Sequence, residues 1–263
     1  MSVKTFTFSL IFGILSYSTA AQKNFPKLEV SIDKAIAGSL QEITFTYTVG
    51  EEKIIHGGGI RMEYPVAYAE TEFLYWNRPQ THESGLLGYV SGETSSGEEV
   101  LLSSYGIAGG IFQCTLKEGE LKKGEKLYVR YKGLVQSLAR DFMVRAQVRT
   151  GTGENWHDVE NPPRIKILPQ AGETIILTSP ADLKIGQTFD LSVVVLDKFG
   201  NLATGYQGNI SFESTDENAA LPDPYTFTDD DSGRHIFENM KYNSPGFQKI
   251  TLKASGGLKS QRR

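Results

Sequence analysis

The side chains best suited to catalysis or metal binding are widely separated along this chain. A metal-dependent hydrolase needs clustered ligands, and His-x-His or His-Glu-x-x-His pairs are the usual form in a sequence. The four histidines are His56, His82, His157 and His235, and none belongs to such a pair. We therefore predict no metal site, no catalytic residue and no bound cofactor, with these histidines in turns or on the surface.

Two short motifs have a chemical and a structural interpretation. Asp229-Asp230-Asp231 offers oxygen ligands to calcium, but it lacks the Asp-x-Asp-x-Asp-Gly spacing of a calcium loop. A turn capped by Asp231 before Ser232-Gly233 is favoured instead. Gly57-Gly58-Gly59 is similar to a phosphate-binding loop, yet residues 60–64 alternate like a strand rather than beginning a helix. The glycines are therefore expected at a strand entry or bulge.

Cys114 is the only cysteine, which excludes a disulfide within the chain. Phe112, Cys114 and Leu116 alternate with polar residues and so share one face of an expected strand. No base is evident nearby that could lower the pKa of the thiol. A buried, inert thiol is the preferred interpretation.

Aromatic residues gather in an irregular stretch at 65–97, and three of them, Tyr68, Tyr75 and Trp76, are the candidate ligand-binding residues. Aromatic rings on such a loop can stack against sugars or anchor a protein partner. They can equally fix the loop to the body of the domain as a small cluster. We favour packing over binding, because aromatic side chains are more often buried than displayed.

The first residues and the composition limit the functional classes. Residues 1–21 read as a signal peptide with a positive start at Lys4, an apolar middle and a small-residue cleavage site at Ser18-Thr19-Ala20. No later segment is apolar enough to span a bilayer. The net charge of −4 gives no basic surface for nucleic acid. We expect a secreted or periplasmic protein, and the sequence leaves its oligomeric state open.

Period-2 alternation of apolar and polar residues dominates after the leader. Ile43, Phe45, Tyr47 and Val49 form one inward row. Phe142, Val144, Ala146 and Val148 are predicted to share a face of one strand at 142–150. The other strands expected in this part lie at 59–64, 99–103, 111–116, 126–131 and 164–168. About eight strands are sufficient for one β-sandwich.

Prolines and glycines near Pro169 interrupt this pattern, and it then begins again. We predict an all-β chain with a β-sandwich domain at 22–169 and an immunoglobulin-like β-sandwich domain at 170–263. In the second domain Phe189, Leu191, Val193 and Val195 should face the core. The strand is expected to end in a turn at Gly200-Asn201, since these residues tolerate the positive φ of a tight reversal. Few contacts are expected to cross the linker.

The part from Val194 to Leu252 resembles bacterial immunoglobulin-like repeats. The residues that carry the resemblance include Gly186-Gln187-Thr188-Phe189, Asp197-Lys198-Phe199-Gly200-Asn201, Tyr206-Gln207-Gly208 and Gly246-Phe247-Gln248. Gly57–Met62, Arg78-Pro79-Gln80 and the order of the domains look like the N-terminal region of a secreted bacterial family of unknown function. Members of that family carry a PHP-like metal-dependent hydrolase domain downstream.

The resemblance implies an accessory or spacer region rather than an enzyme. Similar proteins continue into the hydrolase domain where this chain stops at Arg262-Arg263, so we expect a chain truncated before that domain. The alternative is a module that binds carbohydrate or a cell-surface protein through the aromatic loop at 65–97. An enzyme in its own right would need a cluster of titratable residues that this sequence does not show.

Overall fold

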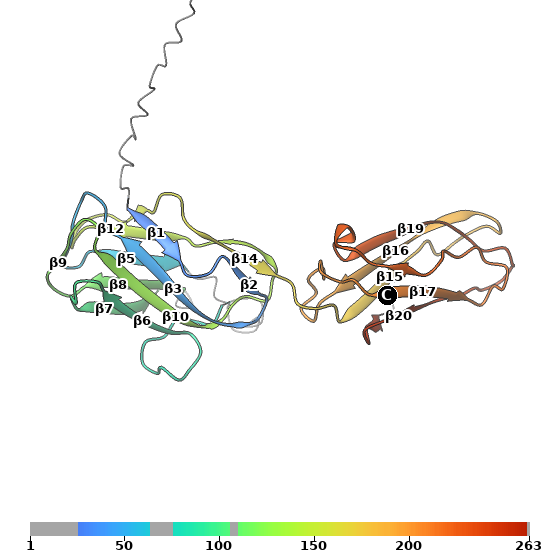
Figure 1. Ribbon diagram of the computed structural model, residues 1–263, viewed down its shortest axis with the longest axis horizontal. Coiled ribbons are helices and arrows are strands. Elements are labelled where there is room, and N and C mark those ends of the chain that lie inside the picture. The colour runs from blue at the N-terminus through green and yellow to red at the C-terminus, as the bar shows by residue number, and fades with distance from the viewer. Residues whose placement is uncertain (1–25, 64–75, 106–109, 262–263) are drawn as a thin grey trace, which may run out of the picture.

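The computed structural model describes residues 26–63, 76–105 and 110–261 (Figure 1). Across these residues the secondary structure consists of short strands and the 3-10 helix η3 (Asp229–Asp231). The strands pair mainly antiparallel and pack as immunoglobulin-like sandwiches, which confirms the predicted all-β class. Within the same residues, no helix has the length and apolar character needed to cross a bilayer.

The first sandwich is built from two larger sheets and two smaller ones. One large sheet has the order β1 (Lys27–Val30), β3 (Leu40–Thr48), β10 (Lys126–Leu134) and β6 (Tyr89–Thr94). The other has the order β13 (His157–Asp158), β12 (Ala146–Arg149), β5 (Gly59–Glu63), β8 (Ile111–Leu116) and β7 (Val100–Tyr105). The smaller sheets are β11 (Arg140–Met143), β14 (Arg164–Leu168) and β2 (Lys34–Ile36), and the pair β4 (Ile54–Ile55) and β9 (Glu120–Leu121).

Alternation along β3 fills the centre of this sandwich. Ile43, Phe45 and Tyr47 are buried, whereas Thr44 and Thr46 between them are partly exposed. Because side chains of a strand point to alternate faces, every second residue of β3 reaches the same core. The predicted inward row is therefore confirmed.

Two features of the first sandwich differ from the predicted strands. The expected strand at 142–150 is two strands, because the chain changes sheets at Val144 and Arg145: β11 pairs with β14, and β12 pairs with β5 and β13. The buried face nevertheless continues through Phe142, Val144 and Ala146. In addition, β6 lies within the stretch that was predicted to be irregular, where it pairs with β10.

The second sandwich has its own strands and its own core. One sheet has the order β19 (Arg234–Lys241), β16 (Thr188–Leu196), β15 (Thr174–Thr178) and β21 (Lys259–Gln261), and the other has β18 (Tyr225–Thr226), β17 (Asn209–Ser214) and β20 (Ile250–Ala254). The inward row of β16 is buried as predicted. It faces Ile210 and Phe212 of the opposite sheet within one hydrophobic cluster.

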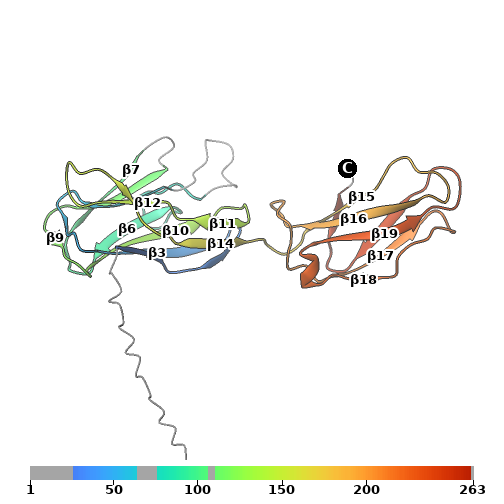
Figure 2. The same cartoon turned by 90° about the horizontal axis from the view of Figure 1, so that it is seen from above.

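The two sandwiches follow one another end to end, and the chain passes between them once, from β14 to β15 (Figures 1 and 2). The buried residues of the first core run from Leu28 to Ile167, and those of the second from Ile175 to Met240. Phe199 belongs by sequence to the second sandwich but packs against the first core. The junction therefore consists of more than a linker.

Candidate functional site

The structure keeps the four histidines apart. His56 Nδ1 lies 2.5 Å from the carbonyl oxygen of Lys117, and His82 and His157 are exposed. His235 is the one that the sequence interpretation misplaced, because its side chain is only 27% exposed and contacts Asp231. Across the described ranges, no group of three or more His, Cys, Asp or Glu side chains is arranged to hold a metal ion.

Cys114 lies at the centre of the first core, as the sequence predicted. It is fully buried, and burial raises the pKa of its thiol to about 12. A thiol with such a pKa stays protonated at neutral pH and is a poor nucleophile. Gly59 pairs with Thr115, the residue after Cys114, and a Cβ added to Gly59 would lie 2.2 Å from the carbonyl oxygen of Cys114. The absence of a side chain at Gly59 lets the backbones of β5 and β8 approach closely at the entry of β5. This favours the predicted strand-entry role over phosphate binding.

Of the three candidate ligand-binding aromatics, Tyr68 and Tyr75 lie outside the described residues. Trp76 is 3% exposed. Its ring centroid lies 5.6 Å from that of Tyr131 and 5.2 Å from that of Phe142. The indole is thus part of the core, and it cannot stack on a ligand in this arrangement.

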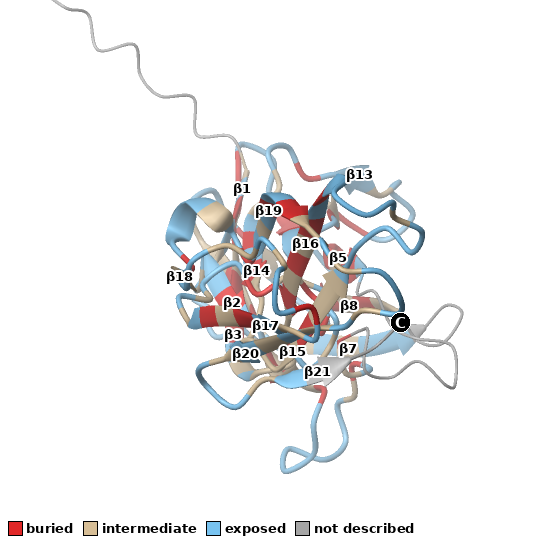
Figure 3. Cartoon of the chain, turned by 90° about the vertical axis from the view of Figure 1, so that its right-hand side faces the viewer, coloured by how far each residue is buried: buried red, intermediate tan, exposed pale blue. Residues whose placement is uncertain are grey.

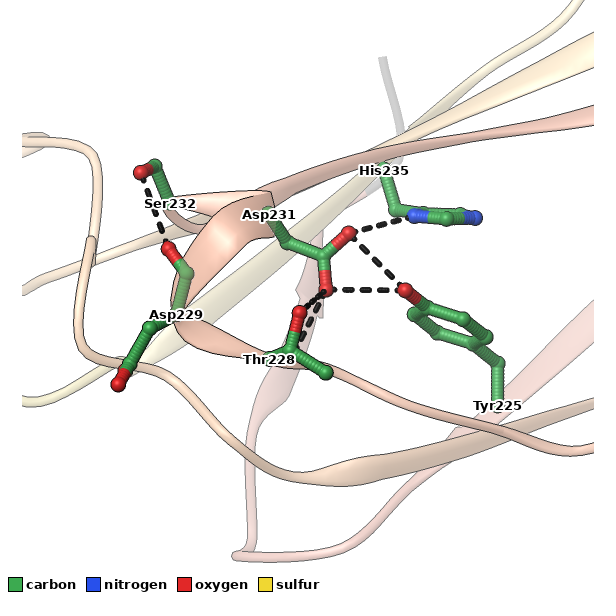
Figure 4. Close-up of polar contacts among 6 residues, drawn as sticks. All are labelled: Tyr225, Thr228, Asp229, Asp231, Ser232 and His235. Atoms are coloured by element: carbon green, nitrogen blue, oxygen red, sulfur yellow. Dashed lines mark hydrogen bonds and ion pairs between the residues drawn. The ribbon is translucent and has the colours of Figure 1, made fainter.

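Asp231 forms the most connected polar cluster of the second sandwich (Figure 4). Its carboxylate accepts hydrogen bonds from the amide of Thr228 and the hydroxyl of Tyr225, and it contacts His235 Nδ1 at 2.6 Å. Burial by itself raises the pKa of Asp231, but the hydrogen bonds from Thr228, His235 and Tyr225 outweigh burial and lower the pKa. The predicted turn capped by Asp231 is therefore confirmed.

An aspartate that holds a histidine can orient a general base. Here the imidazole stacks on Tyr225 with ring centroids 4.0 Å apart and packs against Phe237. The hydroxyls of Tyr225 and Thr228 donate to the same carboxylate, so they are not placed as nucleophiles on the histidine. The cluster closes the connection between β18 and β19.

Asp216 fixes the far end of the second sandwich, which we define as the connections 179–187, 215–224 and 242–249. It is 3% exposed. Its carboxylate accepts hydrogen bonds from the hydroxyl and amide of Ser244 and from the amides of Asn243 and Asn218. The hydroxyl of Ser244 makes the largest contribution to lowering the pKa of Asp216, which falls to about 2.

This cluster predicts a pH dependence. The pKa of Asp216 is lower in the folded than in the unfolded chain. Its contribution to the free energy of unfolding should therefore be fully present above about pH 4 and be lost as the pH falls toward 2. Asp216→Asn removes this titration. Urea unfolding of the second sandwich at several pH values should show a shallower decline for the variant, and equal slopes in both proteins would contradict the assignment.

A cavity of about 640 Å³ opens on the first sandwich between the start of β1, the end of β3 and the strands β12 and β13. Tyr47 lines it, is 4% exposed, and its hydroxyl has no hydrogen-bond partner in the part of the chain that the structure describes. Burial raises the pKa of Tyr47 to about 12, so the hydroxyl stays protonated and neutral at physiological pH. Glu52, Glu154 and Glu160 also line the cavity and form no ion pair with described residues.

The junction between the sandwiches is the site with the most specific geometry. Asp197 organises the turn 197–201, because its carboxylate accepts hydrogen bonds from the amides of Phe199 and Asn201 and from the side chain of Asn201. Gly200 has a φ of 85°, which glycine adopts without strain. The carboxylate also accepts the amide of Gln170 from the linker, at 2.9 Å.

Side chains of this turn and of the linker bind backbone groups of the first sandwich. The side-chain oxygen of Asn201 accepts the amide of Ala139 at 2.8 Å, and its side-chain nitrogen donates to the carbonyl of Ser137 at 2.7 Å. Gln170 donates to the carbonyl of Ala37 at 2.7 Å. The contacts across the linker are confined to this turn and Gln170, but they bind the two sandwiches through specific side chains.

Phe199 completes the junction by packing on Gly38. A Cβ added to Gly38 would lie 2.5 Å from Phe199 Cζ, so the ring occupies the space of a side chain that Gly38 lacks. Gly38 has a φ of 65°, which also favours glycine. The sequence interpretation found the turn but not the surface that receives it.

No protein-family model matches the chain. No curated protein sequence matches it either. The matching solved structures include FdeC, an Escherichia coli adhesin, at 14% identity and a TM-score of 0.30, covering 90% of this chain and 62% of that one. Bacteroides uniformis β-glucuronidase 3 matches at 12% identity and a TM-score of 0.26, covering 88% of this chain and 23% of that one.

A putative membrane-anchored protein from Corynebacterium diphtheriae matches at 12% identity and a TM-score of 0.25, covering 88% of this chain and 49% of that one. The chain thus spans less than two thirds of each of these three structures. Similarity at this level supports no functional argument.

Proposed function

We propose that this chain is a non-catalytic accessory region of a secreted or periplasmic protein, in which two sandwiches form a rigid spacer. The observation that carries the proposal is the interlocked junction, where Phe199, Asn201 and Gln170 reach into the first sandwich. Domains joined by a simple linker reorient freely by default. A partly buried aromatic ring together with a buried amide that bonds two backbone groups restrains that motion.

The polar clusters support a structural role. The carboxylates of Asp197, Asp216 and Asp231 each bind groups of a turn or connection, and each fixes the local backbone. The thiol of Cys114 is buried away from any substrate. These residues position strands and turns, which is what a spacer requires.

The tumbling of the protein in solution tests this proposal. If residues 26–261 behave as one elongated body, ¹⁵N relaxation of amides in β3 and β16 should fit a single anisotropic rotational diffusion tensor. Phe199→Ala should cause the two sandwiches to need separate tensors. Separate tensors already in the unsubstituted protein would contradict a rigid spacer.

The alternative of a carbohydrate- or cell-surface-binding module through the loop at 65–97 now depends on Tyr68 and Tyr75, because the ring of Trp76 is buried. The cavity beside Tyr47 favours a different binding role. Three carboxylates that form no ion pair with described residues, together with a neutral hydroxyl that can accept a hydrogen bond, are suited to a positively charged group. Arg149 also lines the cavity, but its side chain already donates to the carbonyl of Gly57.

Spermidine is a suitable probe for the cavity, with the neutral disaccharide cellobiose as its control. Amide chemical shifts near Tyr47 should move on titration with spermidine and not with cellobiose. Tyr47→Phe keeps the ring and removes only the hydroxyl, whose oxygen would accept a hydrogen bond from an ammonium group, so it should weaken binding while leaving the fold intact. Shifts confined to exposed acidic residues elsewhere, or identical binding by the variant, would exclude the cavity as a cation site.

A further inference from the structure

One arrangement occurs twice: at the end of the first sandwich that meets the second, and at the far end of the second sandwich. In the first, β2 leads through Gly38 into β3, and in the second, β15 leads through Gly186 into β16. The strands β3 and β16 each contain nine residues. Both glycines have a positive φ, 65° and 76°.

The two glycines also have equivalent hydrogen-bond partners and neighbouring strands. The amide of Gly38 donates to the carbonyl of Gln136, just after β10, and the amide of Gly186 donates to the carbonyl of Tyr242, just after β19. β10 and β19 are the antiparallel neighbours of β3 and β16. The last strand of each sandwich pairs in parallel with the strand before the glycine: β14 with β2, and β21 with β15.

At the first of these ends, the turn 197–201 covers the glycine. Phe199 packs on Gly38, and Asn201 binds the backbone of Ser137 and Ala139 in the connection after β10. The chain enters the second sandwich from β14, so the covering turn belongs to the domain that follows in sequence.

At the second end, the equivalent surface is uncovered within the described residues. A Cβ added to Gly186 would meet no described atom within 4 Å. Beside it Ile185 is 61% exposed, and Phe247 in the connection after β19 is 98% exposed. Figure 3 views the molecule from this side, where exposed loop residues face the reader. Asp216 holds the connection 242–249 in place through Asn243 and Ser244, so the surface is ordered in advance.

We propose that Ile185, Gly186 and Phe247 form a docking surface for a further β-sandwich domain that presents an Asp-x-Phe-Gly-Asn turn. The inference rests on the proposed function, since it extends the same junction by one domain. The phenylalanine of the incoming turn packs on Gly186 as Phe199 packs on Gly38, and its asparagine binds the backbone of the connection 242–249. β21 runs parallel to β15, toward this surface, as β14 runs parallel to β2 toward the existing junction.

A second copy of this chain is a poor occupant of the surface. Its own turn 197–201 already covers Gly38 within the same molecule. The partner is therefore a sandwich whose turn is free. A directly linked domain has the advantage of a high effective concentration at the docking surface.

A tandem protein provides the test: residues 26–261 followed directly by a second copy of residues 169–261. The repeated unit carries a complete core that contains no residue of the first sandwich. Spin labels on Glu238→Cys in both copies report the distance across the new junction. We expect one narrow distance, and we expect Phe199→Ala in the third domain alone to abolish the narrow peak.

A second tandem carries labels on Glu29→Cys and on Glu238→Cys of the middle domain, and it reports the existing junction. A narrow distance there together with a broad distance across the new junction would overturn this inference and leave the spacer proposal intact. Broad distances at both junctions would overturn the spacer proposal. A narrow new junction that persists in the Phe199→Ala copy would show docking by other contacts and would also overturn the inference.

Discussion

Val193→Asp is expected to unfold the second sandwich. Val193 is fully buried in the middle of β16, where it pairs with Leu177 of β15 and His235 of β19. The imidazole of His235, on the neighbouring strand, already contacts Asp231 and stacks on Tyr225, so an aspartate at 193 would lack a free partner. An unpaired charge in such a place costs several kcal/mol, of the order of the whole stability of a small domain, about 5 kcal/mol or more.

The matched control is Ser192→Asp, one position earlier on the outer face of the same strand. Its carboxylate remains in contact with water, so the free energy of unfolding should change by less than about 1 kcal/mol. Circular dichroism and the dispersion of amide resonances distinguish the two outcomes. A folded Val193→Asp protein together with an unfolded Ser192→Asp protein would place the register of β16 off by one residue.

The double variant Phe199→Ala/Asn201→Ala is expected to uncouple the two sandwiches. Removing Asn201 leaves the amide of Ala139 and the carbonyl of Ser137 without their partner, and removing the ring of Phe199 exposes apolar surface over Gly38. Together these losses should lower the stability of the second sandwich by roughly 2–4 kcal/mol.

Limited proteolysis and urea unfolding measure this effect. Residues 169–173 should resist cleavage in the unsubstituted protein and become the first site of cleavage in the double variant. Thr204→Ala is the matched control, because Thr204 lies three positions after the turn with an exposed side chain. If the control and the double variant are cut at the same rate, the turn does not hold the junction.

Local alternation was sufficient to predict most strands. Ile43, Phe45 and Tyr47 in β3, like Leu191 and Val193 in β16, are buried because a pleated strand turns every second side chain to one face. Alternation does not say which sheet a strand joins. The change of sheets at Val144 and Arg145 keeps the same period, so the pattern predicted one strand there.

The junction between the sandwiches could likewise be predicted only in its local part. The turn containing Gly200-Asn201 was evident from its residue types, and its conformation depends on neighbours within four positions, as Asn201 does on Asp197. The surface that receives the turn lies far away in sequence: Ala139 is 62 positions from Asn201, and Ala37 is 133 positions from Gln170. A hydrogen bond to a backbone group does not depend on the residue type that carries the group, so a single sequence contains no signal for such a contact.

The distance between the sandwiches tests the rigid junction most directly. Glu29 in β1 and Glu238 in β19 are exposed, and cysteines there accept nitroxide labels while the buried Cys114 does not. Double electron–electron resonance on Glu29→Cys/Glu238→Cys should give a single narrow distance that broadens when Phe199→Ala/Asn201→Ala is added. A broad distribution that is the same with and without those two substitutions would contradict the account.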